Sequence, residues 1–274
     1  MCFFLQSENK GWMKLKIWTL LENTTCRGDL TAEHGLSLYI ETGDRRILFD
    51  MGQTAAFAVN AEKMGVDLAA VDTAILSHGH YDHGGGAATF LTRNDRALLY
   101  VSRYAFQLHY NAAGKYIGLD PALRENPRLI FTEEECRLGE GLCLYSCNGW
   151  AQPWQTDPSG LQTEQDGLFR PEDFRHEQYL LVEEQGKRIL ISGCSHKGIR
   201  NLVHWFQPDV LVGGFHLKSM DPDDPEIRTI GQTLMSYPTV YYTGHCTGQA
   251  QYERLQSIMG DRLQKISTGT VLEI

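Results

Sequence analysis

The ten residues SHGHYDHGGG (77–86) constrain this chain more than any other segment, and they directly follow the apolar run VDTAILS (71–77). Within six positions they supply three imidazoles and one carboxylate, which are ligands for zinc, iron or manganese. Such polar groups directly after a buried strand would be unfavourable without partners. Gly79 and the glycines at 84–86 let the backbone bend tightly there. The pattern predicts a strand that ends in a metal site.

The spacing within this cluster allows one or two metal ions. His78 and His80 can face the same way on an extended turn and hold one ion. Asp82 and His83 follow on the other side of the bend and can hold a second. The alternative is a chance surface cluster or a tag-like tract, and the position at a strand end argues against it.

Apolar runs alternate with helical patterns along most of the chain, which is typical of an α/β fold. The strands that we expect in the first half are 15–20, the hairpin 36–41 and 46–49, then 73–77, 97–102 and 142–146. The strands that we expect in the second half are the hairpin 179–184 and 187–192, then 209–213, 239–243 and 270–274. The helices that we expect are 55–64, 198–206, 225–236 and 249–259.

Two segments resemble each other internally. LSLYIETGDRRILFDMG (36–52) and YLLVEEQGKRILISGC (179–194) both read as strand, turn, basic pair, strand and small residues. The match is short, but with the order of elements it predicts two similar halves packed face to face. His78, His216 and His245 each follow an expected strand, and in α/β folds ligands gather beyond strand ends.

The polar segment 148–175 interrupts the alternation and contains Pro, Gly and two tryptophans. Loops of this length are usually functional or disordered. We interpret it as a lid carrying Trp150 and Trp154, with a plain surface excursion as the alternative. Residues 1–12 are expected to be an N-terminal extension, and residues 13–274 a single domain.

Composition limits the partners and the compartment. The net charge of −9 argues against a nucleic-acid partner, and no run of about 18 apolar residues predicts a membrane span. Seven cysteines in no framework spacing, with no export signal, favour reduced thiols in the cytoplasm. A small-molecule substrate is expected, and a homo-oligomer stays open.

The cluster is similar to the HxHxDH signature of the metallo-β-lactamase superfamily, and Asp50 in ILFDMG matches the motif whose Asp orients the metal histidines. From Met13 onward the chain most resembles the subfamily of dihydropterin ribofuranosylaminobenzene 5′-phosphate synthase-like proteins. The matching pieces are EHGLSLYIET (33–42), LFDMGQT (48–54), LSHGHYDHGG (76–85), ISGCSHKGI (191–199), GGFHL (213–217) and TGHCTG (243–248).

The resemblance implies a four-layer αββα sandwich with the metals in a groove between the sheet edges, and it implies a final ligand at His245. Members place an Asp where this chain has Cys194. Cys194 is either a soft ligand suited to zinc or iron, or an inert buried thiol. The third ligand of the first metal is His196 or His176. We favour His196, because its Gly-Cys-Ser setting is tight and it opens a helix.

We expect a metal-dependent hydrolase, with zinc as the first candidate and iron or manganese as alternatives. A metal-bound hydroxide would attack an ester, a phosphoester or a related phosphorylated or aromatic substrate. Asp82 would both ligate and steer the proton. The residues expected to bind substrate are Glu33, His34, Lys197 and His216. The alternatives are an iron redox enzyme, or a metal-dependent binding or sensor protein without turnover.

Overall fold

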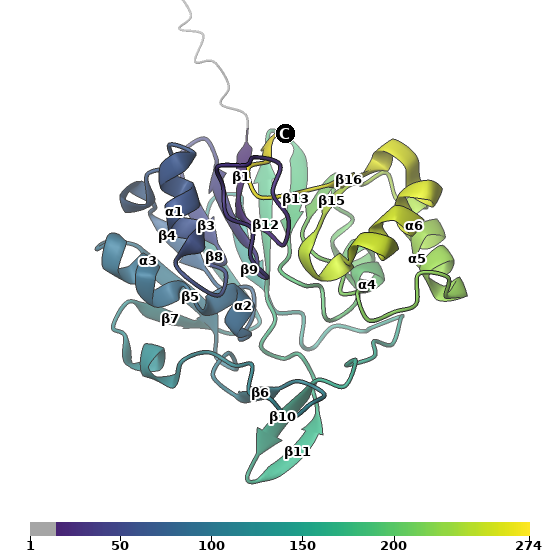
Figure 1. Cartoon of the computed structure of the whole chain (residues 1–274), viewed down its shortest axis with the longest axis horizontal. Helices are drawn as coiled ribbons and strands as arrows, with labels where there is room; N and C mark the ends of the chain where they lie inside the picture. The colour runs from purple at the N-terminus through teal and green to yellow at the C-terminus, as the bar shows by residue number, and fades with distance from the viewer. Residues whose placement is uncertain (1–14) are drawn as a thin grey trace, which may run out of the picture.

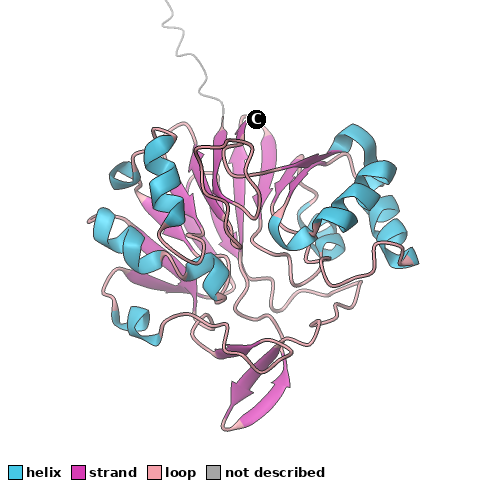
Figure 2. Ribbon diagram, viewed as in Figure 1, coloured by secondary structure: helices cyan, strands magenta, loops and turns pink. Residues whose placement is uncertain are grey.

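Two seven-stranded sheets lie face to face with helices on both outer sides, so the predicted four-layer αββα sandwich is confirmed (Figures 1 and 2). The computed structural model describes residues 15–274, and the predicted extension at 1–12 lies outside that range.

The first sheet is built from the N-terminal half and the last strand. Its strands in spatial order are β17 (Val271–Glu273), β1 (Lys16–Leu21), β2 (Ser37–Glu41), β3 (Arg46–Phe49), β4 (Thr73–Ile75), β5 (Leu98–Ser102) and β7 (Leu129–Thr132). β3, β4, β5 and β7 run parallel. Helices α1 (Ala56–Lys63) and α3 (Ala87–Arg93) lie on its outer side, and the short α2 (Tyr81–Gly84) follows the loop that carries His78 and His80.

The second sheet repeats this plan. Its strands in spatial order are β16 (Leu263–Lys265), β15 (Val240–Thr243), β14 (Val210–Val212), β13 (Lys187–Ile191), β12 (Tyr179–Glu184), β9 (Leu142–Tyr145) and β8 (Glu135–Gly139). β13 to β16 run parallel, and helices α4 (Ile199–Phe206), α5 (Pro225–Met235) and α6 (Gln249–Met259) cover the outer side. The 3₁₀ helices are η1 (Leu68–Ala70), η2 (Pro121–Glu125), η3 (His245–Thr247) and η4 (Gly260–Arg262).

The internal repeat has a structural counterpart. The hairpin β2–β3 opens the parallel run of the first sheet, and the hairpin β12–β13 opens that of the second. An apolar cluster between the sheets includes Ile40 and Phe49 from one and Leu180 and Ile191 from the other. Two further clusters lie between each sheet and its helices.

Segment 148–175 is not structureless. It contains β10 (Gln162–Gln165) and β11 (Leu168–Pro171), which pair with each other and, through β10, with β6 (Leu108–Tyr110). We call this three-stranded unit the arm; its β10–β11 hairpin projects from one end of the molecule in Figure 1. Trp150 packs against Tyr145, Trp205 and Phe206. Within residues 15–274, no helix is long and apolar enough to cross a membrane.

The carboxyl ends of the parallel strands of both sheets converge on one edge of the sandwich, as expected for ligand sites in open α/β sheets. Asp50 follows β3, Cys194 and His196 follow β13, and His245 follows β15. Asp50 and His245 have φ angles of 60° and 51°, in the left-handed region where non-glycine residues are strained. Backbone strain of this kind clusters at functional sites.

Candidate metal centre

The loop between β4 and α2 carries the histidine cluster, and position 79 in it has to be glycine. A Cβ on Gly79 would lie 2.2 Å from the carbonyl oxygen of Ala105, so no larger residue fits. His78 and His80 flank Gly79 and are almost fully buried, while α2 presents Asp82 and His83. The sequence therefore brings four ligand side chains into one small volume.

Hydrogen bonds assign the protonation state of His78. The Ser77 hydroxyl lies 2.7 Å from Asp50 Oδ2 and 2.8 Å from His78 Nδ1. Because the hydroxyl has one proton to donate, giving it to the carboxylate leaves Ser77 Oγ to accept from His78 Nδ1–H. The Nε2 atom of His78 then carries a lone pair, and it is buried with no hydrogen-bond partner.

His83 and His245 are assigned in the same way. Asp50 Oδ2 lies 2.6 Å from His83 Nδ1, and Asn23 Oδ1 lies 2.9 Å from His245 Nδ1. Both Nδ1 atoms therefore donate, and both Nε2 atoms carry lone pairs. These Nε2 atoms lie 3.1 Å apart, close to the spacing of about 3.3 Å between two ligands on a tetrahedral ion with bonds near 2.0 Å.

Asp82 and Cys194 complete the second group of donors. Asp82 Oδ2 lies 3.4 Å from His245 Nε2 and 3.9 Å from His83 Nε2. The Cys194 thiol lies 3.2 Å from His83 Nε2 and within 4.8 Å of a ring nitrogen of His78. Burial lowers the pKa of His83 to about 3, so its ring is neutral and available to a cation.

Asp50 is a hydrogen-bond acceptor and not one of the converging donors. Its carboxylate is fully buried and accepts from the Ser77 backbone, the Ser77 hydroxyl and His83. Burial raises the pKa of Asp50 to about 8, while the Ser77 hydrogen bonds oppose this. Cations on the histidines beside it would favour the ionised carboxylate.

His196 and His176 occupy different places. His196 forms a donor group with His78 and His80, and both of its ring nitrogens are buried without a partner. Its ring stacks on Phe174 with centroids 4.5 Å apart. His176 instead accepts the Gly79 N–H at Nδ1 over 2.8 Å, so its neutral ring carries the proton on Nε2. That assignment leaves His176 no lone pair for a metal.

The thiol of Cys194 faces ring nitrogens and is 3% exposed. Burial and the neighbouring Cys246 thiol hold its pKa well above the ordinary value. A thiolate at this place would therefore require a bound cation, as is general for metal-ligating cysteine.

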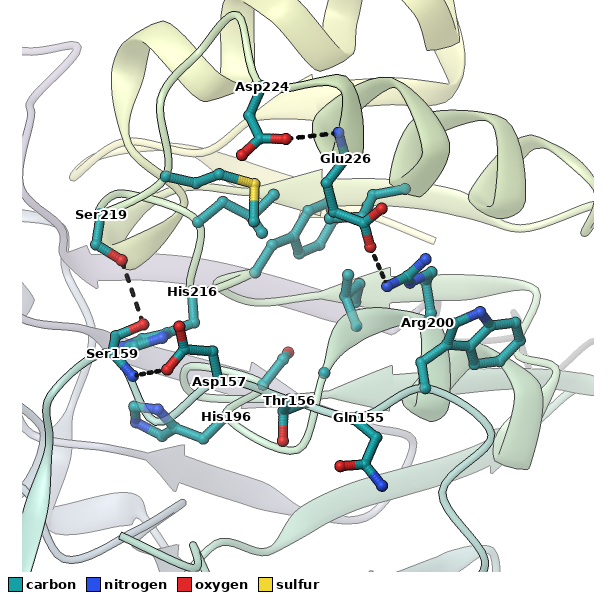
Figure 3. Close-up of a pocket in the computed structure, with 18 of the residues that line it drawn as sticks. Gln155, Thr156, Asp157, Ser159, His196, Arg200, His216, Ser219, Asp224 and Glu226 are labelled. Atoms are coloured by element: carbon teal, nitrogen blue, oxygen red, sulfur yellow. Dashed lines mark hydrogen bonds and ion pairs between the residues drawn. The ribbon is translucent and has the colours of Figure 1, made fainter. Parts of the chain in front are cut away.

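A cleft opens over these side chains. A cavity of about 520 Å³ is lined by Asp82, His196, His245 and Lys218, among others. A second cavity of about 490 Å³ shares His196 and His216 with it and extends toward Trp154 (Figure 3). In Figure 3 the ion pair between Arg200 and Glu226 borders this second cavity. The two cavities share four lining residues, which are Ser159, His196, His216 and Ser219.

The four residues expected to bind substrate divide into two pairs. His34 and His216 line the cleft, and His34 Nε2 lies 3.2 Å from Asp82 Oδ2. Glu33 hydrogen-bonds through both carboxylate oxygens to Thr54. Lys197 is 2% exposed, and its ammonium donates to the carbonyl oxygens of Ser146 and Glu177.

Several residues at the centre carry no local sequence signal. Asn23, which fixes the His245 tautomer, lies 222 positions before it in the chain. Glu177 accepts the backbone N–H of both His196 and Lys197, and thereby holds the corner after β13. Lys218 is an exposed cation in the cleft and follows directly after the GGFHL motif (213–217), which does not include it.

The comparison with known protein families decides the identity of this fold. The model of the metallo-β-lactamase superfamily matches residues 30–216, more than half of the chain. The chain belongs to the metallo-β-lactamase superfamily. The match covers the histidine cluster, Asp50, Cys194 and His196.

Proteins similar to this chain include two curated proteins of Methanocaldococcus jannaschii. An uncharacterised protein is 28% identical and covers 87% of this chain and 93% of its own length. A 7,8-dihydropterin-6-methyl-4-(β-D-ribofuranosyl)-aminobenzene-5′-phosphate synthase is 24% identical, and the match covers 94% of this chain and 96% of the synthase. The crystal structure of Tm1679, a metal-dependent hydrolase of the β-lactamase superfamily, is 26% identical with a TM-score of 0.79, covering 95% of this chain and 99% of that one.

Proposed function

We propose that this protein is a metal-dependent hydrolase with two divalent ions in the cleft. His78, His80 and His196 would hold the first ion, and Asp82, His83 and His245 the second, with Cys194 between them. The observation that carries the proposal is the pair of His83 and His245 lone pairs facing each other at 3.1 Å, which a cation between them would stabilise. Buried, unpartnered ring nitrogens on His78, His80 and His196 support it.

When bound, divalent ions at such a centre lower the pKa of water and polarise a carbonyl or phosphoryl oxygen. Imidazole and thiol donors favour zinc, with iron as the next candidate. Asp82, 13% exposed at its side chain and open to the cleft, would accept and direct a proton there. The Lys218 ammonium would bind an anionic group of the substrate, and the wall around Trp154 would bind its apolar part.

A second candidate is a synthase-like reaction on a phosphorylated, aryl-containing substrate. The M. jannaschii relative that is 24% identical to this chain is named as such a synthase. The exposed cation of Lys218 close to the metal donors would suit a phosphate group. An enzyme of this kind would bind metal fully and yet leave simple esters intact.

The test begins with metal analysis of protein that has never been exposed to a chelator, followed by assays on chromogenic esters and phosphodiesters. We expect one to two metal equivalents per chain, because His78, His80 and His196 form one group of donors and Asp82, His83 and His245 form a second. Asp82→Asn should lower any hydrolysis by orders of magnitude, since it removes charge at the second ion. A metal content below about 0.2 equivalents would contradict the proposal. Full loading without hydrolysis would favour the synthase, an iron redox enzyme or a binding protein.

Two single substitutions decide the third ligand of the first ion. His196→Ala should lose close to one equivalent of metal, because it removes a donor from the His78 and His80 group. His176→Ala should keep its metal content, because the His176 lone pair is engaged by the Gly79 N–H. The reverse result, with metal lost only in His176→Ala, would show that the assignment is wrong.

A further inference from the structure

A buried cluster of one carboxylate and two imidazoles lies behind His80, outside the two donor groups assigned above. It consists of His109 on β6, and Glu172 and His176 on the segment after β11. Glu172 is 5% exposed and both histidines are fully buried. Burying a carboxylate costs free energy unless hydrogen-bond donors compensate for the lost water. The donors around Glu172 therefore indicate which groups the carboxylate serves.

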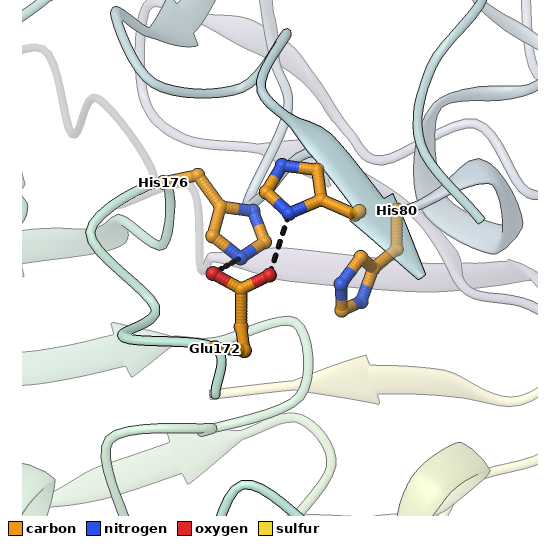
Figure 4. A group of neighbouring side chains, drawn as sticks. His80, Glu172 and His176 are labelled. Carbon is orange, nitrogen blue, oxygen red and sulfur yellow. Dashed lines mark hydrogen bonds and ion pairs between the residues drawn. The ribbon is translucent and has the colours of Figure 1, made fainter. Parts of the chain in front are cut away.

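Ring N–H groups converge on Glu172. His109 Nδ1 lies 2.6 Å from Glu172 Oε2 and donates to it. The Nε2–H of His176 faces Glu172 Oε1 across 3.8 Å, because the other nitrogen of that ring accepts the Gly79 N–H. Figure 4 shows His80 and His176 on two sides of the Glu172 carboxylate. The carboxylate is thus an acceptor at the centre of several donors.

His80 is the remaining donor in this arrangement. One of its ring nitrogens lies within 4.8 Å of the ligand atoms of Glu172, His109 and His176, and its Nε2 is buried without a partner. A neutral imidazole that gives one nitrogen to a metal keeps its proton on the other. A side-chain movement of at most about 2 Å would bring this N–H and the Glu172 carboxylate to hydrogen-bond distance.

We propose that Glu172, held in place by His109, is a positioning residue that accepts the N–H of His80 while the other nitrogen of that ring binds the first metal. The proposal rests on the proposed metal centre and deepens it. An anionic acceptor fixes the metal-binding tautomer and raises the donor strength of the ring. His176 accepts a hydrogen bond from the Gly79 N–H, so residues 172–176 connect the arm to the loop that carries His78 and His80.

A third metal ion within the cluster is the competing explanation, because its four donors lie within 4.8 Å of one another. Two observations disfavour it. A metal on Nε2 of His176 would require that ring to lose both protons, since Nδ1 already accepts a hydrogen bond. The 2.6 Å between His109 and Glu172 is a hydrogen-bond distance, shorter than the spacing of about 3.3 Å between two ligands of one tetrahedral ion.

The experiment measures zinc affinity of the full chain by competition with a chelating dye, for wild type, Glu172→Gln and Glu164→Gln. Glu172→Gln keeps the shape and removes the charge, so we expect zinc affinity at the site that contains His80 to fall about 10- to 100-fold. Glu164, on β10 of the same arm, accepts hydrogen bonds from the Tyr110 hydroxyl at 3.4 Å and from the Gly167 N–H at 3.1 Å, and Glu164→Gln should match wild type. The Co²⁺ absorption spectrum of Glu172→Gln should also change, because it reports the coordination of the ion.

A double-mutant cycle shows whether Glu172 acts through His80. In a His80→Ala background, Glu172→Gln should cause little further loss of affinity. Glu172→Asp retains the charge and should lose less affinity than Glu172→Gln. It also serves as the test variant if Glu172→Gln does not fold. Full additivity in the cycle, or wild-type affinity in folded Glu172→Gln, would overturn the proposal.

Two further outcomes separate this inference from the proposed function. Wild-type protein that binds no zinc refutes the metal centre itself, whereas normal binding in both wild type and Glu172→Gln refutes only the role of Glu172. A His78→Ala, His196→Ala double variant that keeps an ion which Glu172→Gln then removes would show a metal site in the cluster and overturn the positioning role.

Discussion

At the scale of single residues, the protonation of the histidines is fixed by acceptors on the side away from the cleft. Asp50 holds His83, and through the Ser77 hydroxyl it also fixes His78. Asn23 does the same for His245. Each acceptor receives a hydrogen bond from an Nδ1–H group, so the lone pair of each ring is on Nε2 and points into the centre, where a cation would lie.

Asp50→Asn tests this dependence. The carboxylate accepts from the Ser77 backbone, the Ser77 hydroxyl and His83, whereas the amide has one accepting oxygen and an NH₂ group that only donates. The amide cannot satisfy all three donors, so the hydrogen bonds that fix the tautomers of His78 and His83 are weakened. We expect metal affinity to fall about 10- to 100-fold, measured by the chelator concentration that strips half of the metal. Asp72→Asn, at the opposite end of β4 with hydrogen bonds to Arg46 and Thr73, is the control. Equal resistance of both variants to the chelator would contradict the expectation.

At the scale of elements, the corners after β13 and β14 each carry a lysine with a different environment. Lys197 follows β13 and is buried, with its ammonium on two carbonyl oxygens. Lys218 follows β14 and is exposed in the cleft. The anion-binding role that the sequence suggested for Lys197 therefore fits the position of Lys218, and Lys197 stabilises the corner that presents His196.

The two lysines should separate stability from substrate binding. Lys197→Met leaves two buried acceptors unsatisfied, so the free energy of unfolding should fall by about 2–4 kcal/mol in urea titrations. Lys218→Met should change it by less than about 0.5 kcal/mol, since the side chain is exposed. In Lys218→Met the KM for a phosphodiester should rise, while the KM for a neutral ester should stay the same as in wild type. A Lys218→Met enzyme with unchanged KM for both substrates would refute the assignment.

At the scale of the whole molecule, many imidazoles are buried together at the edge shared by the two sheets. Burial lowers the pKa of six of them: His78, His80, His83, His176, His196 and His216. In the unfolded chain these rings take up protons near pH 6.5, whereas in the folded chain they remain neutral to lower pH. In the metal-free protein, the folded state therefore binds fewer protons on these histidines than the unfolded state does.

The metal-free protein should therefore lose stability as the pH falls. Below about pH 6.5 the unfolded state binds more protons, and each such histidine contributes a loss of up to about 1.4 kcal/mol per pH unit. Burial raises the pKa of Asp50 and of Glu177, and these carboxyls act in the opposite direction, but they are two groups against six. Urea midpoints of the chelator-treated chain at pH 7.5 and pH 5.5 measure the effect. Equal midpoints would contradict it, and metal should raise the midpoint at pH 7.5.

Local spacing was enough to predict much of the fold. The two hairpins, the strand before His78 and the helices of the second half lie within one or two residues of their predicted bounds. Such elements are determined by apolar periodicity and turn residues close together in sequence. The strands of the arm were missed, because they are short, polar segments that become strands only by pairing with one another and with β6.

The sequence alone determined which kinds of ligand the chain has and that four of them, His78 to His83, lie together after one strand. Only the tertiary structure decided which distant groups meet them. It brought Asn23 to His245, it placed Glu172 and His176 in one group with His80, and it placed His196 in another group with His78 and His80. The physical reason is that these contacts join segments up to 222 residues apart, and their hydrogen-bond geometry depends on the packing of two sheets rather than on spacing along the chain.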